Sequence, residues 1–175
     1  MPIQGRPSAA GRDSGRRAAM ATIVDAGDRA PDFSLMDQAG TAVRLKEFKG
    51  KPVVLYFYPK DDTPGCTKEA CDFRDADAAI KKTGAVILGV SLDGETAHQK
   101  FIAKYKLPFS LLCDEDAKVS KAYAVYKEKS LYGRKYWGIE RSTFVLDGAG
   151  VIAAAFRKVK VDGHAKEVLA VLKAL

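Results

Sequence analysis

Two cysteines, Cys66 and Cys71, are the residues of this sequence best suited to chemistry. The stretch that carries them, residues 58–71, reads YPKDDTPGCTKEAC and follows the apolar run Val53 to Phe57. The length of this run and its β-branched and aromatic content predict a buried strand, and helical periodicity follows the first cysteine. Cys66 is therefore expected in a turn that leads from a strand into a helix.

The local sequence around Cys66 favours a reactive thiolate. Thr63 suits the N-cap of the helix, and Pro64 has the fixed backbone dihedral that is preferred at the first helical position. Cys66 then lies three residues after the cap, where a capping box would place Glu or Gln. Unpaired backbone N–H groups and the positive end of the helix dipole both favour negative charge at that point. We interpret Cys66 as a nucleophile.

The rest of the chain predicts alternating strands and helices. Short alternating segments at 33–36 and 42–45 flank a turn and indicate an N-terminal hairpin. Further strands are expected at 85–90, 109–112, 143–146 and 151–156; helices are expected from the cysteine turn to Gly84, from about 97 to 105, at 116–123 and from about 162 onward. This order predicts an α/β fold, with a mixed β-sheet, helices on both faces and an N-terminal β-hairpin.

Composition fits one compact domain with a sizeable core, since 47% of the 175 residues are hydrophobic and 29% are charged. No run approaches the roughly 18 apolar residues that a membrane span needs, and the first twenty residues lack the apolar centre of a secretory signal. Three cysteines are too few for a disulfide framework, which favours thiol chemistry in a reducing compartment. We therefore expect a soluble, cytoplasmic protein with no membrane partner.

A disproportionate share of the formal net charge of +7 lies near the beginning of the chain. Residues 1–20 hold four arginines and one aspartate, so the remainder carries a net charge of +4, which is mild for a domain. These twenty residues are rich in Gly, Ala, Ser, Pro and Arg and show no periodicity. We expect a disordered leader at 1–20 and a domain at 21–175. An organellar transit peptide, a misassigned start before Met20 and, less favoured, a nucleic-acid arm are the alternatives for the leader.

Two motifs carry a resemblance to a known family. They are Pro59-x-x-x-Thr63-x-x-Cys66, with Cys71 five residues later, and GIERSTF at residues 138–144, which contains Arg141. Together they resemble the peroxiredoxins, in particular the group called bacterioferritin comigratory protein or peroxiredoxin Q. The resemblance extends over most of the chain after the leader. It implies a thioredoxin-like fold and a peroxidase that reduces hydroperoxides with its own cysteines, without a cofactor.

The resemblance and the chemistry of peroxides together suggest a role for each motif residue. When Cys66 attacks one peroxide oxygen, the other departs with developing negative charge, so hydrogen-bond donors must converge on both oxygens. The side chains of Thr63 and Arg141 can donate to them. The backbone N–H groups of Gly65 and Cys66 complete the expected substrate-binding donors. Arg141 stays cationic and so favours the thiolate. Pro59 is expected to shield the sulfur and to shape the loop.

The expected product is a sulfenic acid on Cys66, which condenses with Cys71, the resolving cysteine implied by the resemblance, to give a disulfide. Residues five apart in an ideal helix have Cα atoms about 8 to 9 Å apart, whereas a disulfide requires about 7 Å or less. We therefore predict that the first turns of the helix unwind between the thiol and disulfide forms. Unwinding would expose the disulfide to a dithiol reductant, thioredoxin as the resemblance implies. An intramolecular bond favours a monomer and does not forbid a dimer.

Plainer interpretations compete with catalytic ones at several residues. Cys113 lies at the end of a predicted strand, which favours a structural thiol over a substitute resolving cysteine. A metal site is disfavoured, because Cys66 and Cys71 have no second pair of ligands nearby in the sequence. His98 and His164 are the only histidines, and both are expected on exposed faces of helices. The sequence therefore predicts no bound metal.

Two further segments allow more than one interpretation. Asp61 and Asp62 are expected to solvate the turn rather than to perform acid–base chemistry. The segment Tyr126 to Trp137 interleaves basic and aromatic residues, a pattern typical of nucleic-acid surfaces. Because this segment immediately precedes Arg141, we favour an active-site wall or a reductant-docking surface over nucleic-acid binding.

For the whole protein, the alternatives to a peroxidase are a thiol–disulfide oxidoreductase acting on protein disulfides and a non-enzymatic thiol redox sensor. A thioredoxin-like fold hosts the first of these activities as well. The spacing of Cys66 and Cys71 departs from the C-x-x-C redox motif, which argues against a thiol–disulfide oxidoreductase. Turnover of a peroxide separates the three functions.

Overall fold

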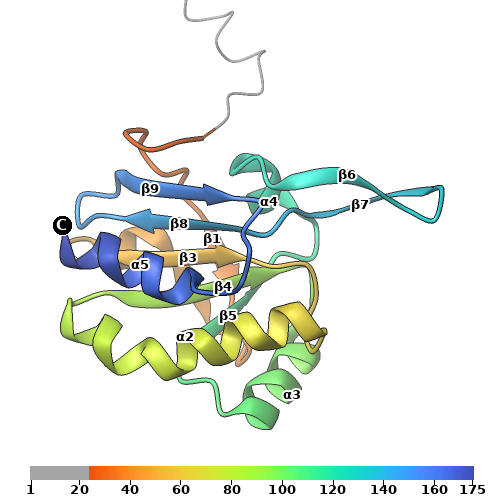
Figure 1. Cartoon of the computed structure of the whole chain (residues 1–175), viewed down its shortest axis with the longest axis horizontal. Helices are drawn as coiled ribbons and strands as arrows, with labels where there is room; N and C mark the ends of the chain where they lie inside the picture. The colour runs from red at the N-terminus through yellow and green to blue at the C-terminus, as the bar shows by residue number, and fades with distance from the viewer. Residues whose placement is uncertain (1–23) are drawn as a thin grey trace, which may run out of the picture.

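The computed structural model describes residues 24–175, so the predicted leader at 1–20 lies outside the described residues. The strands are β1 (Ser34–Met36), β2 (Ala42–Arg44), β3 (Val53–Phe57), β4 (Val86–Ser91), β5 (Ser110–Cys113), β6 (Tyr126–Leu131), β7 (Arg134–Ile139), β8 (Ser142–Leu146) and β9 (Ile152–Arg157). The helices are α2 (Pro64–Lys82), α3 (Glu95–Tyr105), α4 (Lys118–Ala122) and α5 (His164–Lys173), with a short 3-10 helix, η1 (Leu45–Phe48). Strands and helices alternate from β3 to α4 as the sequence predicted, and four consecutive strands, β6 to β9, then precede α5 (Figure 1).

Seven strands form one mixed sheet in the order β2-β1-β5-β4-β3-β8-β9. β3, β4 and β5 run parallel, whereas β8 is antiparallel to β3 and β1 is antiparallel to β5. The N-terminal hairpin of β1 and β2 therefore extends one edge of the sheet, and β9 forms the other edge. This arrangement confirms the predicted mixed sheet with an N-terminal β-hairpin.

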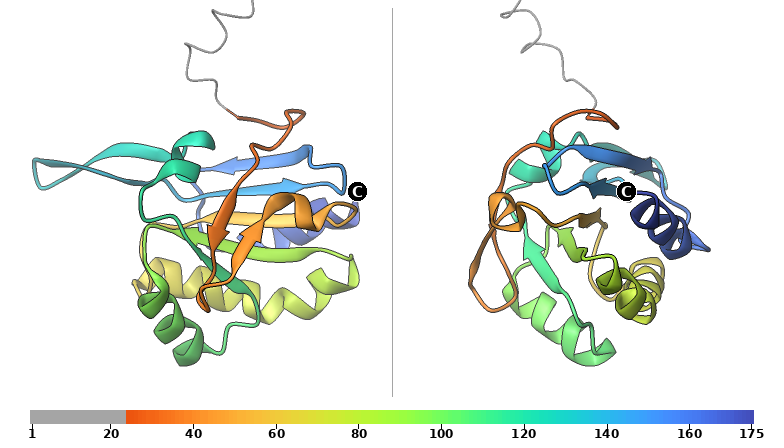
Figure 2. Two further views of the ribbon diagram at one scale, coloured as in Figure 1. Left: turned by 180° about the vertical axis from the view of Figure 1, so that it is seen from behind. Right: turned by 90° about the vertical axis from the view of Figure 1, so that its left-hand side faces the viewer.

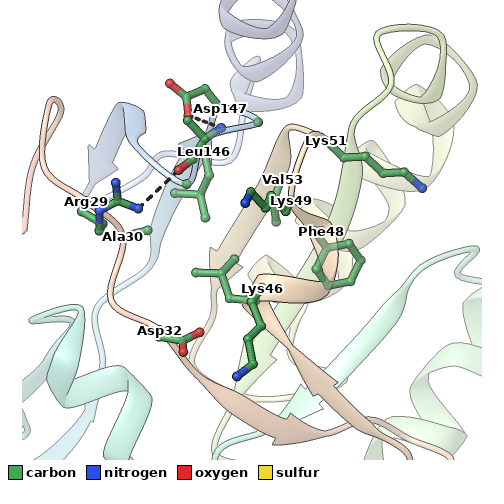
Figure 3. A pocket seen from close by; sticks show the side chains of 14 residues that line it. Arg29, Ala30, Asp32, Lys46, Phe48, Lys49, Lys51, Val53, Leu146 and Asp147 are labelled. Atoms are coloured by element: carbon green, nitrogen blue, oxygen red, sulfur yellow. Dashed lines mark hydrogen bonds between the residues drawn. The ribbon is translucent and has the colours of Figure 1, made fainter.

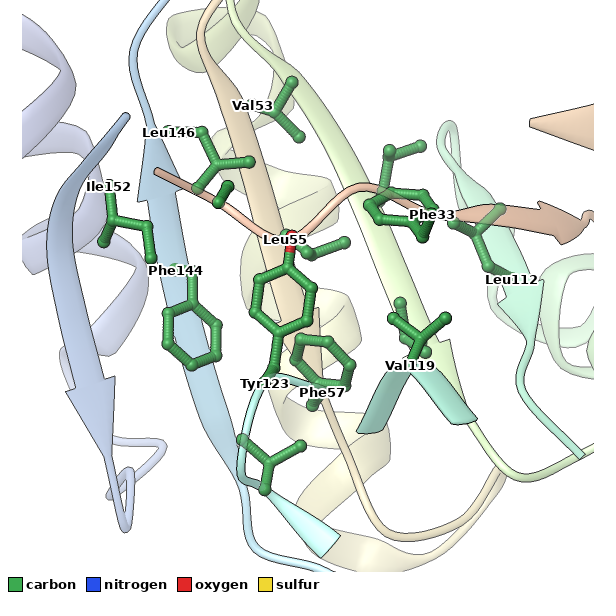
Figure 4. Packing of buried hydrophobic residues seen from close by; sticks show 14 of the residues in the cluster. Phe33, Val53, Leu55, Phe57, Leu112, Val119, Tyr123, Phe144, Leu146 and Ile152 are labelled. Carbon is green, nitrogen blue, oxygen red and sulfur yellow. The ribbon is translucent and has the colours of Figure 1, made fainter. Parts of the chain in front are cut away.

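Helices cover the two faces of the sheet unequally (Figure 2). α2, α3 and α5 contribute Phe73, Phe101 and Val168 to a hydrophobic cluster on one face. On the other face, the segment before β1 and the short helix α4 cover a second cluster, in which Tyr123 packs against Phe57 (Figure 4). β3 is buried along its whole length, because alternate side chains enter the two clusters. Helices thus lie on both faces as predicted, but within residues 24–175 the second face carries only short ones, α4 and η1.

α2, the helix that carries both motif cysteines, begins and ends where the sequence predicted. Pro64 is its first residue, and Thr63 occupies the N-cap position. Gly84 follows the C-cap residue with φ +86°, the left-handed conformation in which glycine commonly ends helices. One face of the helix is buried against the sheet because apolar residues recur there at helical spacing, including Ala70, Phe73 and Ile80.

The segment Tyr126 to Trp137, for which no strand was predicted, is almost entirely β-structure. It forms most of the hairpin of β6 and β7, which projects from the body of the protein (Figures 1 and 2). The two turn residues, Tyr132 and Gly133, both have positive φ, a combination that two-residue hairpin turns favour. This turn is hard to predict from the sequence, because tyrosine is not a usual residue at the first of these positions.

Candidate active site

The sheet register explains how Cys66 and Arg141, 75 residues apart in sequence, come together. Cys66 lies in the first turn of α2, shortly after the C-terminal end of β3, and Arg141 directly precedes β8. β8 is antiparallel to β3, and Ser142 lies opposite Phe57. Arg141 therefore reaches the end of β3 from which the cysteine loop departs. The connection from β7 to β8 and the first turn of α2 lie at the same end of the molecule (Figure 1).

Arg141 binds both a thiol and a carboxyl group. Its Nη2 lies 3.3 Å from Sγ of Cys66, and its Nη1 donates to Oε1 of Glu69 at 2.8 Å. Burial alone would lower the pKa of Arg141, but Glu69 and Cys66 outweigh burial and raise it. Burial raises the pKa of Glu69 to about 7, against the opposing charge of Arg141. The site therefore contains a permanent cation next to a carboxyl group whose charge changes near neutral pH.

Cys66 is 1% exposed and packs in the cluster that α2 forms with the sheet. Because little water surrounds the sulfur, Arg141 stabilises a thiolate more strongly there than it would at the protein surface. Gly65 allows this close approach: a Cβ atom at position 65 would lie only 3.1 Å from Nη2 of Arg141. The absence of a side chain at Gly65 therefore makes room for the guanidinium.

Thr63 occupies the N-cap position, but its side chain does not cap the helix. The hydroxyl instead donates to the carbonyl oxygen of Lys60 at 2.8 Å, because the loop folds back on itself before α2 begins. The predicted position of Thr63 is therefore confirmed, whereas the expected capping bond is absent. Donation to Lys60 leaves the oxygen lone pairs of Thr63 free to accept a hydrogen bond. Pro59 lies half-buried in the same loop.

Cys71 is half-buried and free. Because α2 is continuous from Pro64 to Lys82, helical geometry separates Cys71 from Cys66 by more than a disulfide permits. The structure therefore shows the dithiol form of the protein, and the unwinding of the helix stays a prediction.

Cys113, the third cysteine, is at the end of β5 and is also free. Burial raises the pKa of Cys113 to about 11, with further contributions from Glu115 and Glu95. A thiol with this pKa remains protonated at neutral pH and is a poor nucleophile. This property supports the interpretation of Cys113 as a structural thiol.

Asp61 and His98 form a buried pair, although both were expected at the surface. Asp61 is 8% exposed and His98 is 0% exposed. Oδ2 of Asp61 lies 2.6 Å from Nδ1 of His98, and Oδ1 accepts a hydrogen bond from the hydroxyl of Tyr58. The prediction of a solvated Asp61 and an exposed His98 was therefore wrong. A signal did exist for the histidine, which lies three residues before the buried Phe101 and hence on the same helix face.

His164 is also buried, contrary to the prediction of an exposed histidine. Its Nε2 lies 2.7 Å from Oγ1 of Thr143, and burial, with a smaller effect of Arg141, lowers its pKa to about 4. Its position four residues before the buried Val168 could have indicated this burial. The two histidines do not meet in a metal site: residues 24–175 contain no group of three or more His, Cys, Asp or Glu side chains that could hold a metal ion.

A cavity of about 360 Å³ lies at the other end of the sheet, where β3 begins and β8 ends (Figure 3). Its lining combines basic side chains, such as Arg29 and Lys46, with apolar ones, such as Val53 and Leu146. Cys66 does not line it, so the cavity is separate from the candidate active site. Within the described part of the chain, no helix is long and apolar enough to cross a membrane.

A buried thiol beside a permanent cation, on a thioredoxin-like mixed sheet, is the arrangement of a thiol-dependent peroxidase. Residues 26–155 match the AhpC/TSA family, and the chain belongs to this family as a peroxiredoxin. Peroxiredoxin Bcp of Bacillus subtilis is 49% identical to it over 150 residues, which cover 86% of this chain and 96% of that protein.

Solved structures of the same group agree with the fold. The bacterioferritin comigratory protein of Xanthomonas campestris superimposes with a TM-score of 0.78 and is 47% identical, with 81% of this chain and 90% of that chain covered. A variant of PrxQ from Xylella fastidiosa gives a TM-score of 0.83 at 40% identity, with 87% of this chain and 98% of that chain covered. These comparisons confirm the thioredoxin-like fold and the family resemblance that the two motifs suggested.

Proposed function

We propose that this protein reduces hydrogen peroxide and organic hydroperoxides through a sulfenic acid on Cys66 and an intramolecular disulfide between Cys66 and Cys71. The observation that carries the proposal is the 3.3 Å contact between Nη2 of Arg141 and Sγ of Cys66 in the first turn of α2. The Xanthomonas campestris relative has a described alkyl peroxide reduction activity, which supports the substrate class.

In the first step, the Cys66 thiolate attacks one oxygen of the hydroperoxide. The S–O bond forms while the O–O bond breaks, so the sulfur is oxidised and the peroxide is reduced. The sulfenic acid keeps the hydroxyl that was attacked, and the hydroxide or alkoxide that leaves takes a proton from solvent. Arg141 stabilises the thiolate and the departing oxygen, while the lone pairs of Thr63 orient the peroxide O–H group. Backbone N–H groups at Gly65 and Cys66, in the first turn of α2, add further donors.

In the second step, the thiol of Cys71 attacks the sulfur of the Cys66 sulfenic acid. A disulfide forms, and the sulfenic hydroxyl leaves as water with the proton of Cys71. Because the folded helix keeps the two sulfurs apart, its first turns unwind for this step. Thioredoxin or a similar dithiol protein then reduces the disulfide and is itself oxidised to a disulfide. We further propose a cytoplasmic location and a monomer, without excluding a dimer.

The burial of Cys66 favours a peroxidase over an oxidoreductase that acts on protein disulfides. Cys66 is only 1% exposed, so a disulfide on the surface of a folded protein is too large to reach its sulfur, whereas a small hydroperoxide needs far less space. The same burial in the dithiol form explains why a reductant would need the unwound, oxidised form of the helix.

Stopped-flow consumption of hydrogen peroxide and of an organic hydroperoxide, with a thioredoxin system present, tests the proposal. We expect Cys66→Ser to lose turnover, and Cys71→Ser to consume one equivalent of peroxide without thioredoxin-dependent recycling. Turnover by Cys66→Ser at the wild-type rate would contradict the proposed function. Mass mapping of the oxidised wild type should find a disulfide between Cys66 and Cys71, and a disulfide that includes Cys113 would contradict the assigned resolving cysteine.

A further inference from the structure

His98 lies between two hydrogen-bond acceptors in the interior of the protein. Its Nδ1 is 2.6 Å from Oδ2 of Asp61, and its Nε2 is 2.9 Å from the carbonyl oxygen of Leu112 on β5. An ionised carboxylate and a carbonyl can only accept, and a neutral imidazole has one N–H group. Only the imidazolium form donates to both partners at once. The geometry therefore indicates that His98 carries a positive charge in the folded protein.

The groups around His98 come from three segments. Asp61 and Tyr58 belong to the loop after β3, Asp93 follows β4, and Cys113 is next to Leu112 on β5. Burial lowers the pKa of His98, but the hydrogen bond and charge of Asp61 outweigh it, and the Leu112 carbonyl and Asp93 add to the same effect. The pKa of His98 is raised as a result, which agrees with the geometry of its two acceptors.

Asp61 belongs to the loop that leads from β3 to Cys66. Its backbone N–H donates to Oδ2 of Asp93 at 2.8 Å, so both its backbone and its side chain are fixed. The next residue, Asp62, accepts hydrogen bonds from Lys104 and Tyr105, which also place it against α3. Of these two attachments to α3, the one through Asp61 is buried, and removing one partner of a buried ion pair is strongly destabilising.

We propose that His98 is a positioning residue for the peroxide reaction: its imidazolium holds Asp61 and thereby fixes the loop that presents Thr63 to Cys66. The hydroxyl of Thr63 is itself bonded to the carbonyl of Lys60, the neighbour of Asp61, so a displacement of Asp61 displaces Thr63. The hydrogen bonds of His98 reach the loop and β5 rather than the sulfur, and its effect on the reaction is indirect. This inference rests on the proposed function of Cys66.

The charge of His98 gives this role a definite pH dependence. The folded-state pKa of His98 is raised above its ordinary value. The part of the stabilisation that depends on the charge of His98 is therefore complete below about pH 6.5, the unfolded pKa of histidine. It is lost as the pH rises through the folded pKa, because the ion pair and one of the two hydrogen bonds are then removed. The rate of the peroxide reaction should consequently decline on the alkaline side.

The test is the second-order rate constant for single-turnover oxidation of Cys66 by hydrogen peroxide, measured with the full chain from pH 5.5 to 9.5. In His98→Gln, the amide nitrogen can donate to one acceptor while the amide oxygen faces the other. We expect this variant to react on the order of 10-fold more slowly at pH 7 and to lack the alkaline decline. The matched control is His164→Gln, which changes the other buried histidine and should keep a rate within about twofold of wild type, together with the alkaline decline.

Thermal unfolding separates positioning from a purely structural contribution. If His98→Gln lowers only the melting temperature, while its rate constant and pH profile match those of wild type, the proposal is wrong. If His98→Gln does not fold, the same profile is measured on Asp61→Asn, which removes the carboxylate charge at nearly constant shape; an unchanged rate and alkaline decline would again overturn the proposal. Failure of the proposed function is a different result, namely undiminished peroxide consumption by Cys66→Ser.

Discussion

The two sides of Cys66 are held in different ways. The loop before it is attached to α3 through Asp61 and Asp62, and to the segment after β4 through Asp93. The first turns of α2 after it pack Cys66 and Ala70 into the core, and their buried polar contacts run through Arg141, which bonds to Cys66 and Glu69. The buried polar contacts of the loop thus involve no redox group, whereas those of the first helix turns include the reacting sulfur.

This difference predicts which side moves when the sulfur is oxidised. A thiolate at Cys66 carries a negative charge, and a disulfide does not, so oxidation removes one of the two anionic partners of Arg141. The pair of Asp61 and His98 contains no redox group and keeps its interactions. We infer that the loop stays in place as a fixed pivot, and that the helix unwinds from Pro64 onward.

Replacing Arg141 should have the largest effect, because in the proposed mechanism this residue stabilises both the thiolate and the departing oxygen. We expect Arg141→Met to lower the second-order rate constant for hydrogen peroxide on the order of 100-fold or more, and Arg141→Lys to fall between that variant and wild type. Stopped-flow oxidation of Cys66 measures both.

The matched control is Arg157→Met, which changes a partly buried arginine of β9 that donates to the backbone carbonyls of Val24, Tyr123 and Ala124. This control should lose stability and keep its rate. Equal rates for Arg141→Met and wild type would contradict the proposed stabilisation of the thiolate and the departing oxygen by Arg141.

Gly65→Ala should slow the peroxide reaction less than Arg141→Met does, and it should not lower the stability of the protein. Alanine in the first turn of α2 favours the helix over glycine, but its Cβ would crowd Nη2 of Arg141 at 3.1 Å. We expect unchanged or higher thermal stability, with a peroxide rate lower on the order of 10-fold. The control is Gly138→Ala on β7, where a Cβ would meet only ordinary contacts of 3.5 Å and longer. A normal rate in Gly65→Ala would show that the guanidinium does not need this space.

Glu69 should make stability depend on pH, with a modest effect on rate. Its folded-state pKa is about 7, raised above its ordinary value of 4.5 mainly by burial. Because the folded protein retains a proton that the unfolded chain has already released, stability falls as the pH rises from 4.5 through 7. The loss of stability between pH 5 and pH 8 that corresponds to this difference in pKa is about 2 to 3 kcal/mol. Denaturant unfolding at pH 5 and pH 8 should show this loss in wild type and not in Glu69→Gln; an equal loss in both proteins would assign the pH dependence to other groups.

The smallest effect is expected at the exposed attachment of the loop. The side chains of Lys104 and Asp62 form an ion pair at the surface, where water and salt screen the interaction. Lys104→Ala should therefore keep the peroxide rate within about twofold of wild type, in contrast to His98→Gln. If Lys104→Ala slowed the reaction as much as His98→Gln, the buried pair could not be the principal anchor of the loop.

Much of the fold could be predicted from the sequence, because the signals were local. The apolar run of β3, the helix start at Pro64 and the helix stop at Gly84 each follow from a few neighbouring residues. The burial of Asp61 could not be predicted in this way, because its partner His98 is 37 residues away. The contact of Arg141 with Cys66 depends on the pairing of β3 with β8, and only the family resemblance pointed to that arginine before the sheet was known.

The most direct test of the central claim is hydrogen–deuterium exchange, followed by mass spectrometry, on the dithiol and disulfide forms of the full chain. We predict that residues 64–73 lose protection from exchange in the disulfide form while residues 58–62 keep it. Cys71→Ser treated with peroxide is the control, because it oxidises Cys66 without forming the disulfide. Unchanged protection of residues 64–73, or equal loss of protection in both segments, would contradict a fixed loop and a helix that unwinds.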